Sequence, residues 1–390
     1  MTERFEGSFA GAEAIPEEAA AAALAVLRSG RLHRYAAEEP SQAALLEDEF
    51  AAFTGAAYAL ALASGGAAIQ IALRALGVSH GDRVLTNAWT LAPVPGAIAA
   101  VGGVPVLVET TADLVIDLGD LAAKAGEGRV LLLSHMRGHV GDMGALMALC
   151  QTAGLAVVED CAHTMGSAWD GVPSGRHGAA ACYSTQTYKH LNSGEGGLLA
   201  TDDPALMARA VLLSGSYMHY PRHRAAPPPD RFEPIRLDLP NLSARMDELR
   251  AALLRPQLRA LPARAARWGA LYRAVEAGLE GTRGLRLIPR DPREAFVGSS
   301  IQVALDLPPA AIAGVVARAR DRGVELKWFG APDPQGFTSR HDHWAWVPPR
   351  PLPRTDAVLA RLLDMRLPLT FSVEDCALIA RIVRDEVEAA

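Results

Sequence analysis

The chain has 390 residues, of which 50% are hydrophobic and 21% are charged, and its formal net charge is -6. A chain of this length predicts a large domain and a smaller one. The acidic balance offers no basic field for phosphate backbones or anionic lipids, so we expect neither nucleic acid nor membrane as a partner. No uncharged apolar stretch is long enough to span a bilayer and no signal-peptide pattern opens the chain, so we expect a cytoplasmic protein.

The four cysteines stand singly among apolar neighbours, at positions Cys150, Cys161, Cys182 and Cys376. They lack the close paired spacing that metal-binding cysteines show. We therefore expect small buried hydrophobic residues at these positions and no metal site.

Short apolar runs alternate with helix-like stretches over residues 58–202, which is the pattern of a mostly parallel sheet with helices on both faces. Several runs are continuously apolar, so the strands are expected to be buried on both sides. The predicted fold class is therefore α/β. The expected strands are 58–63, 84–88, 104–108, 130–135, 156–160, 180–184 and 197–201, with helices at 67–75, 91–101 and 143–154.

The pattern changes after residue 202, where a helix over 204–214 and a polar loop rich in Pro and Arg over 221–240 are expected. We predict a large domain over residues 1–250, with an N-terminal helical segment, and a smaller α+β domain over 251–390. The elements expected around and beyond this boundary are helices at 246–263, 264–280, 308–322 and 373–388, and a strand at 300–305.

Asp160 and Lys189 form the candidate catalytic pair. Asp160 ends one predicted strand and Lys189 follows another, and open α/β sheets bind their ligands at the carboxyl ends of the strands. A lysine amine can form a Schiff base with an aldehyde cofactor, while a carboxylate can keep a pyridine nitrogen protonated. Taken alone the pair is a weak signal, because strand-end acids and surface lysines are common.

The residues around this pair carry a more specific signal. Residues 157–163 read Val-Val-Glu-Asp-Cys-Ala-His, and residues 189–197 read Lys-His-Leu-Asn-Ser-Gly-Glu-Gly-Gly. Both segments resemble motifs of the DegT/DnrJ/EryC1/StrS family of sugar aminotransferases, which use pyridoxal 5'-phosphate (PLP) and have fold type I. The resemblance implies that Lys189 is the Schiff-base lysine, that Asp160 contacts the pyridine nitrogen, and that His163 and Ser184 contact the ring hydroxyl and the phosphate. Sugar dehydratases of the family have His in place of this lysine, so Lys189 favours amino transfer.

The turn at Ser64, Gly65 and Gly66 joins a predicted strand to a helix through small residues, which suits an anion at a helix N-terminus. An ordinary tight turn is the alternative. The turn resembles the phosphate loop of the family, with Gly66 in place of a threonine. A nearby segment resembles the one that supplies an aromatic ring over the cofactor. Here either Trp89 stacks on the cofactor, or Leu91 does and Trp89 is a core residue.

Residues 241–249 resemble the family segment that reaches the phosphate bound by the other subunit. The resemblance implies this role for Arg245, with Ser243 in place of an asparagine, and a homodimer with shared active sites. A surface arginine at a helix start is the alternative. His135 lies in another similar segment, where a structural histidine is the favoured interpretation.

The resemblance ends near residue 258, and the segment 322–344 diverges most. Its residues 336–344 are dense in polar and aromatic groups, which is typical both of ligand binding and of dimer contacts. Residues 217–224 are equally ambiguous, since Arg222, His223 and Arg224 suit either an anionic group of a substrate or a solvated charge run, and we favour the latter.

Three functions remain open at this point. The first is a PLP-dependent aminotransferase, which by the resemblance moves an amino group from glutamate or glutamine to a keto-sugar or related ketone in secondary metabolite or cell-surface sugar biosynthesis. The second is a PLP-dependent lyase, cyclase or dehydratase acting on an amino acid or unusual sugar. The third is a regulatory or assembly protein without turnover. Lys189 favours the first, and the sequence does not name the amino acceptor.

Overall fold

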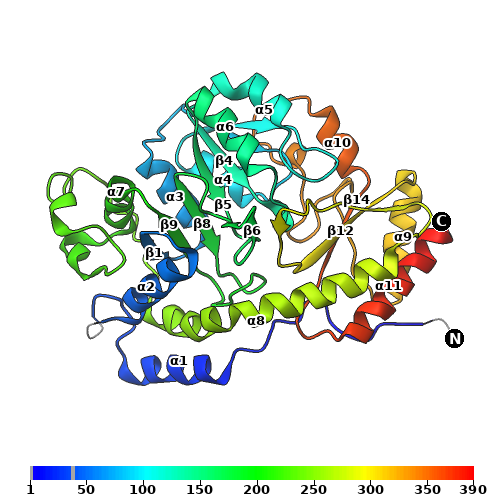
Figure 1. Ribbon diagram of the computed structural model, residues 1–390, viewed down its shortest axis with the longest axis horizontal. Helices are drawn as coiled ribbons and strands as arrows, with labels where there is room; N and C mark the ends of the chain where they lie inside the picture. The colour runs from blue at the N-terminus through cyan, green and yellow to red at the C-terminus, as the bar shows by residue number, and fades with distance from the viewer. Residues whose placement is uncertain (1–2, 37–39) are drawn as a thin grey trace.

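A seven-stranded sheet forms the centre of the computed structural model, which describes residues 3–36 and 40–390 (Figure 1). The strand order is β1-β9-β8-β5-β4-β2-β3. All neighbouring pairs are parallel except those of β9, which runs antiparallel to both β1 and β8. The predicted mostly parallel sheet is confirmed, and each predicted strand ends within one residue of the observed one: β1 (Tyr58–Leu62), β2 (Arg83–Asn87), β3 (Val104–Val108), β4 (Val130–Ser134), β5 (Ala156–Asp160), β8 (Ala180–Ser184) and β9 (Gly197–Thr201).

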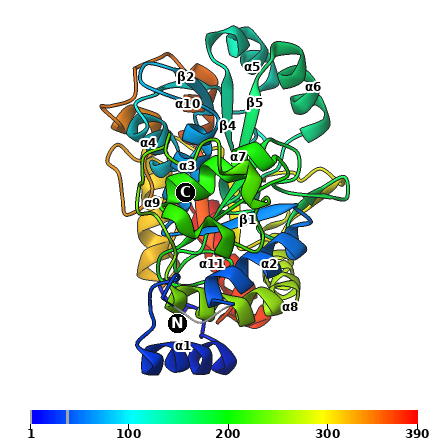
Figure 2. The same ribbon diagram turned by 90° about the vertical axis from the view of Figure 1, so that its left-hand side faces the viewer.

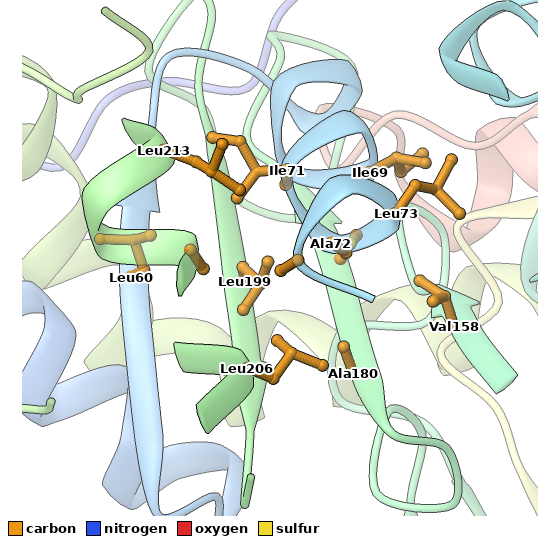
Figure 3. Packing of buried hydrophobic residues seen from close by; sticks show 14 of the residues in the cluster. Leu60, Ile69, Ile71, Ala72, Leu73, Val158, Ala180, Leu199, Leu206 and Leu213 are labelled. Atoms are coloured by element: carbon orange, nitrogen blue, oxygen red, sulfur yellow. The ribbon is translucent and has the colours of Figure 1, made fainter. Parts of the chain in front are cut away.

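Helices cover both faces of this sheet. On one face α3 (Gly65–Ala75), α4 (Pro93–Ala100) and α7 (Pro204–Ser214) pack in a hydrophobic cluster that includes Leu60, Ile71 and Leu199 (Figure 3). On the other face α2 (Gln42–Thr54), α5 (Leu118–Lys124) and α6 (Met143–Ala153) bury the alternate strand residues, among them Ala59 and Val157. Because successive strand residues point to opposite faces, this burial on both sides explains the continuously apolar strands.

One long helix, α8 (Glu248–Leu279), replaces the two helices predicted over 246–263 and 264–280. Pro256 and Pro262 lie inside it and each removes a backbone donor, so local sequence favours a break. Tertiary packing overrides this preference, because the buried face of α8 joins the core beside the large sheet at Leu254 and continues into the C-terminal core at Val275. The helix runs along both parts of the molecule, and α1 (Glu17–Ser29) packs against it (Figures 1 and 2).

A smaller antiparallel sheet of order β10-β12-β14-β13 forms the C-terminal part. The predicted strand and the last two predicted helices are confirmed as β12, α9 and α11. The N-terminal segment also packs here, since Phe5 and Phe9 meet Phe371 edge-on with ring centroids 5.0 Å apart. The division at residue 250 stays a prediction. The remaining bounds are β10 (Leu285–Leu287), β12 (Ser300–Leu305), α9 (Pro309–Asp321), β13 (Lys327–Trp328), α10 (Pro353–Leu359), β14 (Leu362–Arg366) and α11 (Val373–Glu388), with a third sheet of β11 (Glu294–Ala295), β6 (Ala168–Trp169) and β7 (Val172–Pro173).

Two expectations from composition can be compared with this fold. All four cysteines are free and buried, as predicted. Within the described parts of the chain, every helix is too short or too polar to cross a bilayer.

Candidate active site

Three polar side chains meet at the carboxyl edge of the large sheet because β4, β5 and β8 are neighbouring parallel strands. Ser134 ends β4, Asp160 ends β5 and Ser184 ends β8, and Ser134 pairs directly with Asp160 in the sheet. The structure therefore brings the predicted strand-end acid to the edge where ligands bind in such sheets.

Asp160 is buried, with 5% of its surface exposed, and both carboxyl oxygens accept hydrogen bonds. Oδ2 accepts from the Ser134 hydroxyl at 3.0 Å, and Oδ1 accepts from the backbone N–H of Ala162 at 3.1 Å. Burial raises the pKa of Asp160, while the positive charge of Lys189 and these hydrogen bonds oppose the rise. A buried carboxyl group of this kind is stabilised most by a cationic or N–H partner close to its oxygens.

Lys189 lies in the loop between β8 and β9, with its Nζ 2.9 Å from Nε2 of His163. Burial and, after it, the positive charge of Arg137 lower the pKa of Lys189 to about 7, whereas the charge of Asp160 acts in the opposite direction. Burial also holds the pKa of His163 well below its usual range, so Nε2 of its neutral ring can accept a hydrogen bond donated by the Lys189 amine. A lysine whose neutral form is well populated near pH 7 is an activated nucleophile and base.

The turn before α3 forms a compact cradle against Ser184. Ser64 caps the helix, since its hydroxyl accepts from the backbone N–H of Ala67 at 3.0 Å. A Cβ on Gly65 would lie 2.9 Å from Cβ of Ser184, a distance that side chains essentially never adopt, so only glycine fits between the two. Gly66 is less confined, because its nearest contact would be Ser64 Oγ at 3.8 Å. The cradle thus joins a helix N-terminus to a strand-end hydroxyl, which is a favourable anion site.

Trp89 is enclosed in a hydrophobic cluster with Met136 and Phe329, and only 1% of its surface is exposed. Its ring meets those of His139 and Phe329 edge-on, each at 5.8 Å between centroids. This placement contradicts the prediction of Trp89 as a cofactor contact, because the ring is used in core packing. Leu91 lies half-buried at the border of the same cluster, as in the second alternative drawn from the sequence.

Arg245 and Ser243 lie beside the end of β1. Arg245 forms an isolated bridge with Leu62, and its Nη1 donates to the carbonyl of Gly215 at 2.7 Å. Ser243 is exposed and has a φ of 49°, in the left-handed region, where its N–H donates to Oδ1 of Asn241. The contribution of these two residues to a partner subunit's site stays a prediction.

The divergent C-terminal segment reaches the edge of the site through Phe337. This exposed ring meets Tyr188, the neighbour of Lys189, edge-on at 6.4 Å between centroids. The polar groups that follow bind one another or nearby backbone, since Arg340 pairs with Asp342 and His343 contacts the carbonyl of Pro332. Most of the polar character of this loop is therefore structural.

The segment 217–224 is not the solvated charge run that the sequence favoured. His223 is buried, with Nε2 2.7 Å from the hydroxyl of Tyr35 and Nδ1 3.4 Å from Oε2 of Glu47. Arg224 pairs with Asp48. These contacts tie the segment to the N-terminal part of the chain, whose buried Arg34–Glu47 ion pair was not predicted.

Sequence reasoning missed several polar residues at the site. Ser134 could have been found, because it ends the strand next to the one that carries Asp160. His135 is the structural histidine expected, with Nε2 3.0 Å from the buried carboxylate of Glu159. Arg137, Lys327 and Asp364 had no comparable signal, since they come from three separate segments.

The two sheets are arranged as in solved aminotransferase structures. A model of the DegT/DnrJ/EryC1/StrS aminotransferase family matches residues 13–384. The chain therefore belongs to this family, which confirms the resemblance seen in the two motifs.

Two curated relatives and two solved structures illustrate the similarity. L-glutamine:scyllo-inosose aminotransferase of Streptomyces griseus is 37% identical over 163 residues, 41% of this chain and 38% of that protein. The dTDP-3-amino-3,4,6-trideoxy-alpha-D-glucose transaminase of Streptomyces venezuelae is 34% identical over 246 residues, 62% of this chain and 61% of that protein. The matches thus span less than two thirds of these relatives.

Among solved structures, DesV of Streptomyces venezuelae is 28% identical, with a TM-score of 0.80 over 95% of this chain and 94% of that one. The aminotransferase TlmJ of Streptoalloteichus hindustanus has a TM-score of 0.83 over 100% of this chain and 99% of that one. At 24% identity, TlmJ supports the fold alone.

Proposed function

We propose that this chain is a PLP-dependent aminotransferase that transfers an amino group from glutamate or glutamine to a keto-sugar or a related cyclic ketone. The observation that carries the proposal is the placement of Lys189, His163 and Asp160 at one sheet edge, beside the Ser64–Ser184 cradle. Family membership and the names of the relatives support the same reaction class.

The residues present fit PLP. The cradle offers the N-terminus of α3 and the Ser184 hydroxyl to a phosphate, at a place where a Cβ on Gly65 would collide with Ser184. Asp160 would face the pyridine nitrogen, since its buried carboxyl group gains from an N–H partner. Lys189 would hold the cofactor through its amine, and His163 would lie next to it.

The roles of the protein groups follow from their protonation. When bound, PLP supplies an aldehyde for amine exchange and a ring that accepts electrons released at the substrate Cα. Lys189, with a pKa of about 7, can take a proton from that carbon as a general base and then donate it again as a general acid. His163 fixes the position of the lysine amine, and Asp160 provides the negative charge that stabilises a protonated ring nitrogen.

We further propose a cytoplasmic homodimer in which Arg245 and Ser243 complete the partner's phosphate site, and domains over residues 1–250 and 251–390. Large exposed apolar side chains near Arg245, among them Tyr217 and Leu242, support an interface on this side. A mixed dimer tests the shared site: an Arg245→Gln chain combined with a Lys189→Ala chain should regain activity that both homodimers lack. Activity that stays at the level of the separate variants would exclude sharing.

Absorbance of the purified holoenzyme tests the reaction class. Addition of glutamate or glutamine should abolish the visible band of the lysine-bound cofactor, and a ketone acceptor should restore it. Lys189→Ala should lack the band, whereas Lys124→Ala, altered at a lysine paired with Asp120, should keep it. A band that survives every amino donor would exclude an aminotransferase and favour a lyase, cyclase or dehydratase, while the lack of any band would favour a protein without turnover.

A further inference from the structure

A group of cations from three separate segments surrounds one buried carboxylate beside the candidate active site. Arg137, in the turn after β4, places Nη2 2.8 Å from Oδ2 of Asp364 on β14, whose side chain is 0% exposed. The backbone of Lys327 on β13 lies opposite that of Asp364 in the register of the small sheet, and Arg366 lies two residues further along β14. These four residues make up the cation cluster.

The positive charge in the cation cluster is only partly balanced. Arg366 is satisfied elsewhere, because it pairs with Glu13 at 2.7 Å and donates to the carbonyl of Gly11 at 2.8 Å. Asp364 forms an ion pair with Arg137, and its Oδ1 accepts from Nε2 of Gln302 at 2.8 Å, whereas Lys327 lies opposite it in the sheet register. Two cations therefore lie near one buried carboxylate that pairs with only one of them, so the site carries a net positive charge.

Arg137 has a strained backbone conformation that its surroundings hold in place. Arg137 has a φ of 54°, which is uncommon for a residue with a side chain and persists only where the surroundings hold it. Its side chain is 12% exposed, and among the described residues its Nε has no hydrogen-bond partner. An arginine held in this way retains donor capacity for an additional anion.

The cation cluster adjoins the reactive lysine. Gly138, next to Arg137, packs so closely on His163 that a Cβ would lie 3.2 Å from the His163 carbonyl oxygen, and His163 contacts Lys189. Arg366 lies over the ring of Tyr188, with its guanidinium carbon 5.0 Å from the ring centroid. The charges of Arg137 and Lys327 both lower the pKa of Lys189, after burial, which places the cluster within electrostatic reach of its amine.

We infer that Arg137 and Lys327 form a carboxylate-binding subsite beside Lys189 and determine which substrates the enzyme accepts. The inference rests on the proposed function, because an amino acid donor carries a carboxylate on the same carbon whose proton Lys189 would remove. That carboxylate must lie close to the lysine during the reaction, and Arg137 supplies a planar guanidinium that matches its geometry. An acidic ketone acceptor would present the same chemistry from the other substrate.

The first test measures binding of glutarate, a dicarboxylate without an amine, to the holoenzyme by calorimetry. Arg137→Gln should weaken glutarate binding about tenfold or more, which is the usual effect of losing a hydrogen bond between charged groups. Arg137→Lys should restore part of the affinity, because it keeps the positive charge but loses the planar paired donors of the guanidinium. Arg361→Gln, which removes an exposed pair with Asp306 on the opposite end of β14, should leave binding unchanged.

The second test identifies the source of the carboxylate. The half-saturating concentration is measured in single turnovers for glutamate and for isoglutamine, in which the α-carboxylate is an amide. If the donor binds here, Arg137→Gln should raise this value for glutamate about tenfold and leave isoglutamine unchanged. If an acidic acceptor binds here, Arg137→Gln should raise the half-saturating concentration only in the second half-reaction, for an acidic ketone as acceptor.

The two tests also separate the inference from the proposed function. Failure of every amino donor to react would overturn the aminotransferase proposal, while the glutarate measurement still reports on the subsite. Unchanged glutarate binding in both Arg137→Gln and Lys327→Gln, with melting temperatures close to that of the parent protein, would overturn the subsite.

Discussion

The edge of the large sheet and the cation cluster of the small sheet differ in how their buried charged groups are balanced. At the edge, Asp160 has its hydrogen bonds to Ser134 and Ala162, and burial moves Lys189 towards its neutral form. In the cluster, Asp364 pairs with Arg137, and Lys327 lies opposite Asp364 in the sheet without an ion pair to it. Burial thus produces a reactive amine at the sheet edge, whereas the cation cluster contains more cations than carboxylates.

The comparison is sharpest for two half-buried lysines, Lys189 and Lys327. The chain contains three lysines, Lys124, Lys189 and Lys327, and the first pairs with Asp120 at 2.6 Å. Burial lowers the pKa of both Lys189 and Lys327. Only Lys189 lies against His163 at the sheet edge, so we assign chemistry to Lys189 and anion binding to Lys327.

The largest expected effect distinguishes these two lysines. Lys189→Ala should lower turnover by about 10²- to 10⁴-fold, the usual contribution of a general acid and base, and should abolish covalent cofactor binding. Lys327→Ala should keep the visible cofactor band and raise the half-saturating concentration of a carboxylate donor. Steady-state kinetics of the two variants make the comparison, and equal losses of turnover in both would remove the distinction between the regions.

Asp160→Asn is expected to have the next largest effect. The amide keeps the size of the side chain and loses its negative charge, so turnover should fall about 10²-fold, as when one preorganised electrostatic contact is removed. Ser134→Ala removes only a hydrogen bond to Asp160 and should cost much less turnover. Measurement of kcat for both variants would contradict the role of Asp160 if Asp160→Asn lost no more than Ser134→Ala.

Gly65→Ala tests the cradle on the large sheet. Its new methyl group would meet Ser184 Cβ at 2.9 Å, so the free energy of unfolding should fall by about 1–3 kcal/mol and PLP should bind less tightly. Gly126→Ala is the matched control, because a Cβ there would have nothing within 4 Å. Denaturant titration and PLP titration of both variants provide the measurements. A Gly65→Ala variant that behaves like the control would show that the cradle can relax.

The pH dependence of apoenzyme stability is expected to be the smallest effect. The pKa of Lys189 is about 7 in the folded protein, below its ordinary value of 10.5, so between these values the unfolded chain binds more protons. Stability should therefore rise with pH across this window, by at most about 1.4 kcal/mol per pH unit from this group. Lys189→Met should reduce that slope in denaturant titrations at pH 7 to 10, and an unchanged slope would contradict the lowered pKa.

Local sequence predicted the large sheet well. Its strands are short apolar runs bounded by turns, so strand ends and the residues that follow them, such as Asp160, could be placed before the fold was known. The continuous helix α8 could not be predicted, because its two prolines favour a break and only packing along its whole length explains it. The choice between Trp89 as a cofactor contact and Trp89 as a core residue stayed open for a similar reason, since sequence position alone did not reveal the core cluster around it.

The cation cluster had no sequence signal of its own. Arg137 falls in a segment that served only to support the resemblance, and Asp364 lies more than 200 residues away. The charge balance of the cluster depends on which residues the small sheet brings next to β4. Such balances are a property of the fold, so they can be stated only once the contacts are known.

The most direct test of the account is the site of covalent attachment. Reduction of the PLP-loaded protein with borohydride, followed by digestion and mass spectrometry, fixes the cofactor on the lysine that holds it. We expect a single modified peptide that contains Lys189, with Lys124 and Lys327 unmodified. Modification of Lys327, or the absence of any modified lysine in a protein that binds PLP, would contradict it.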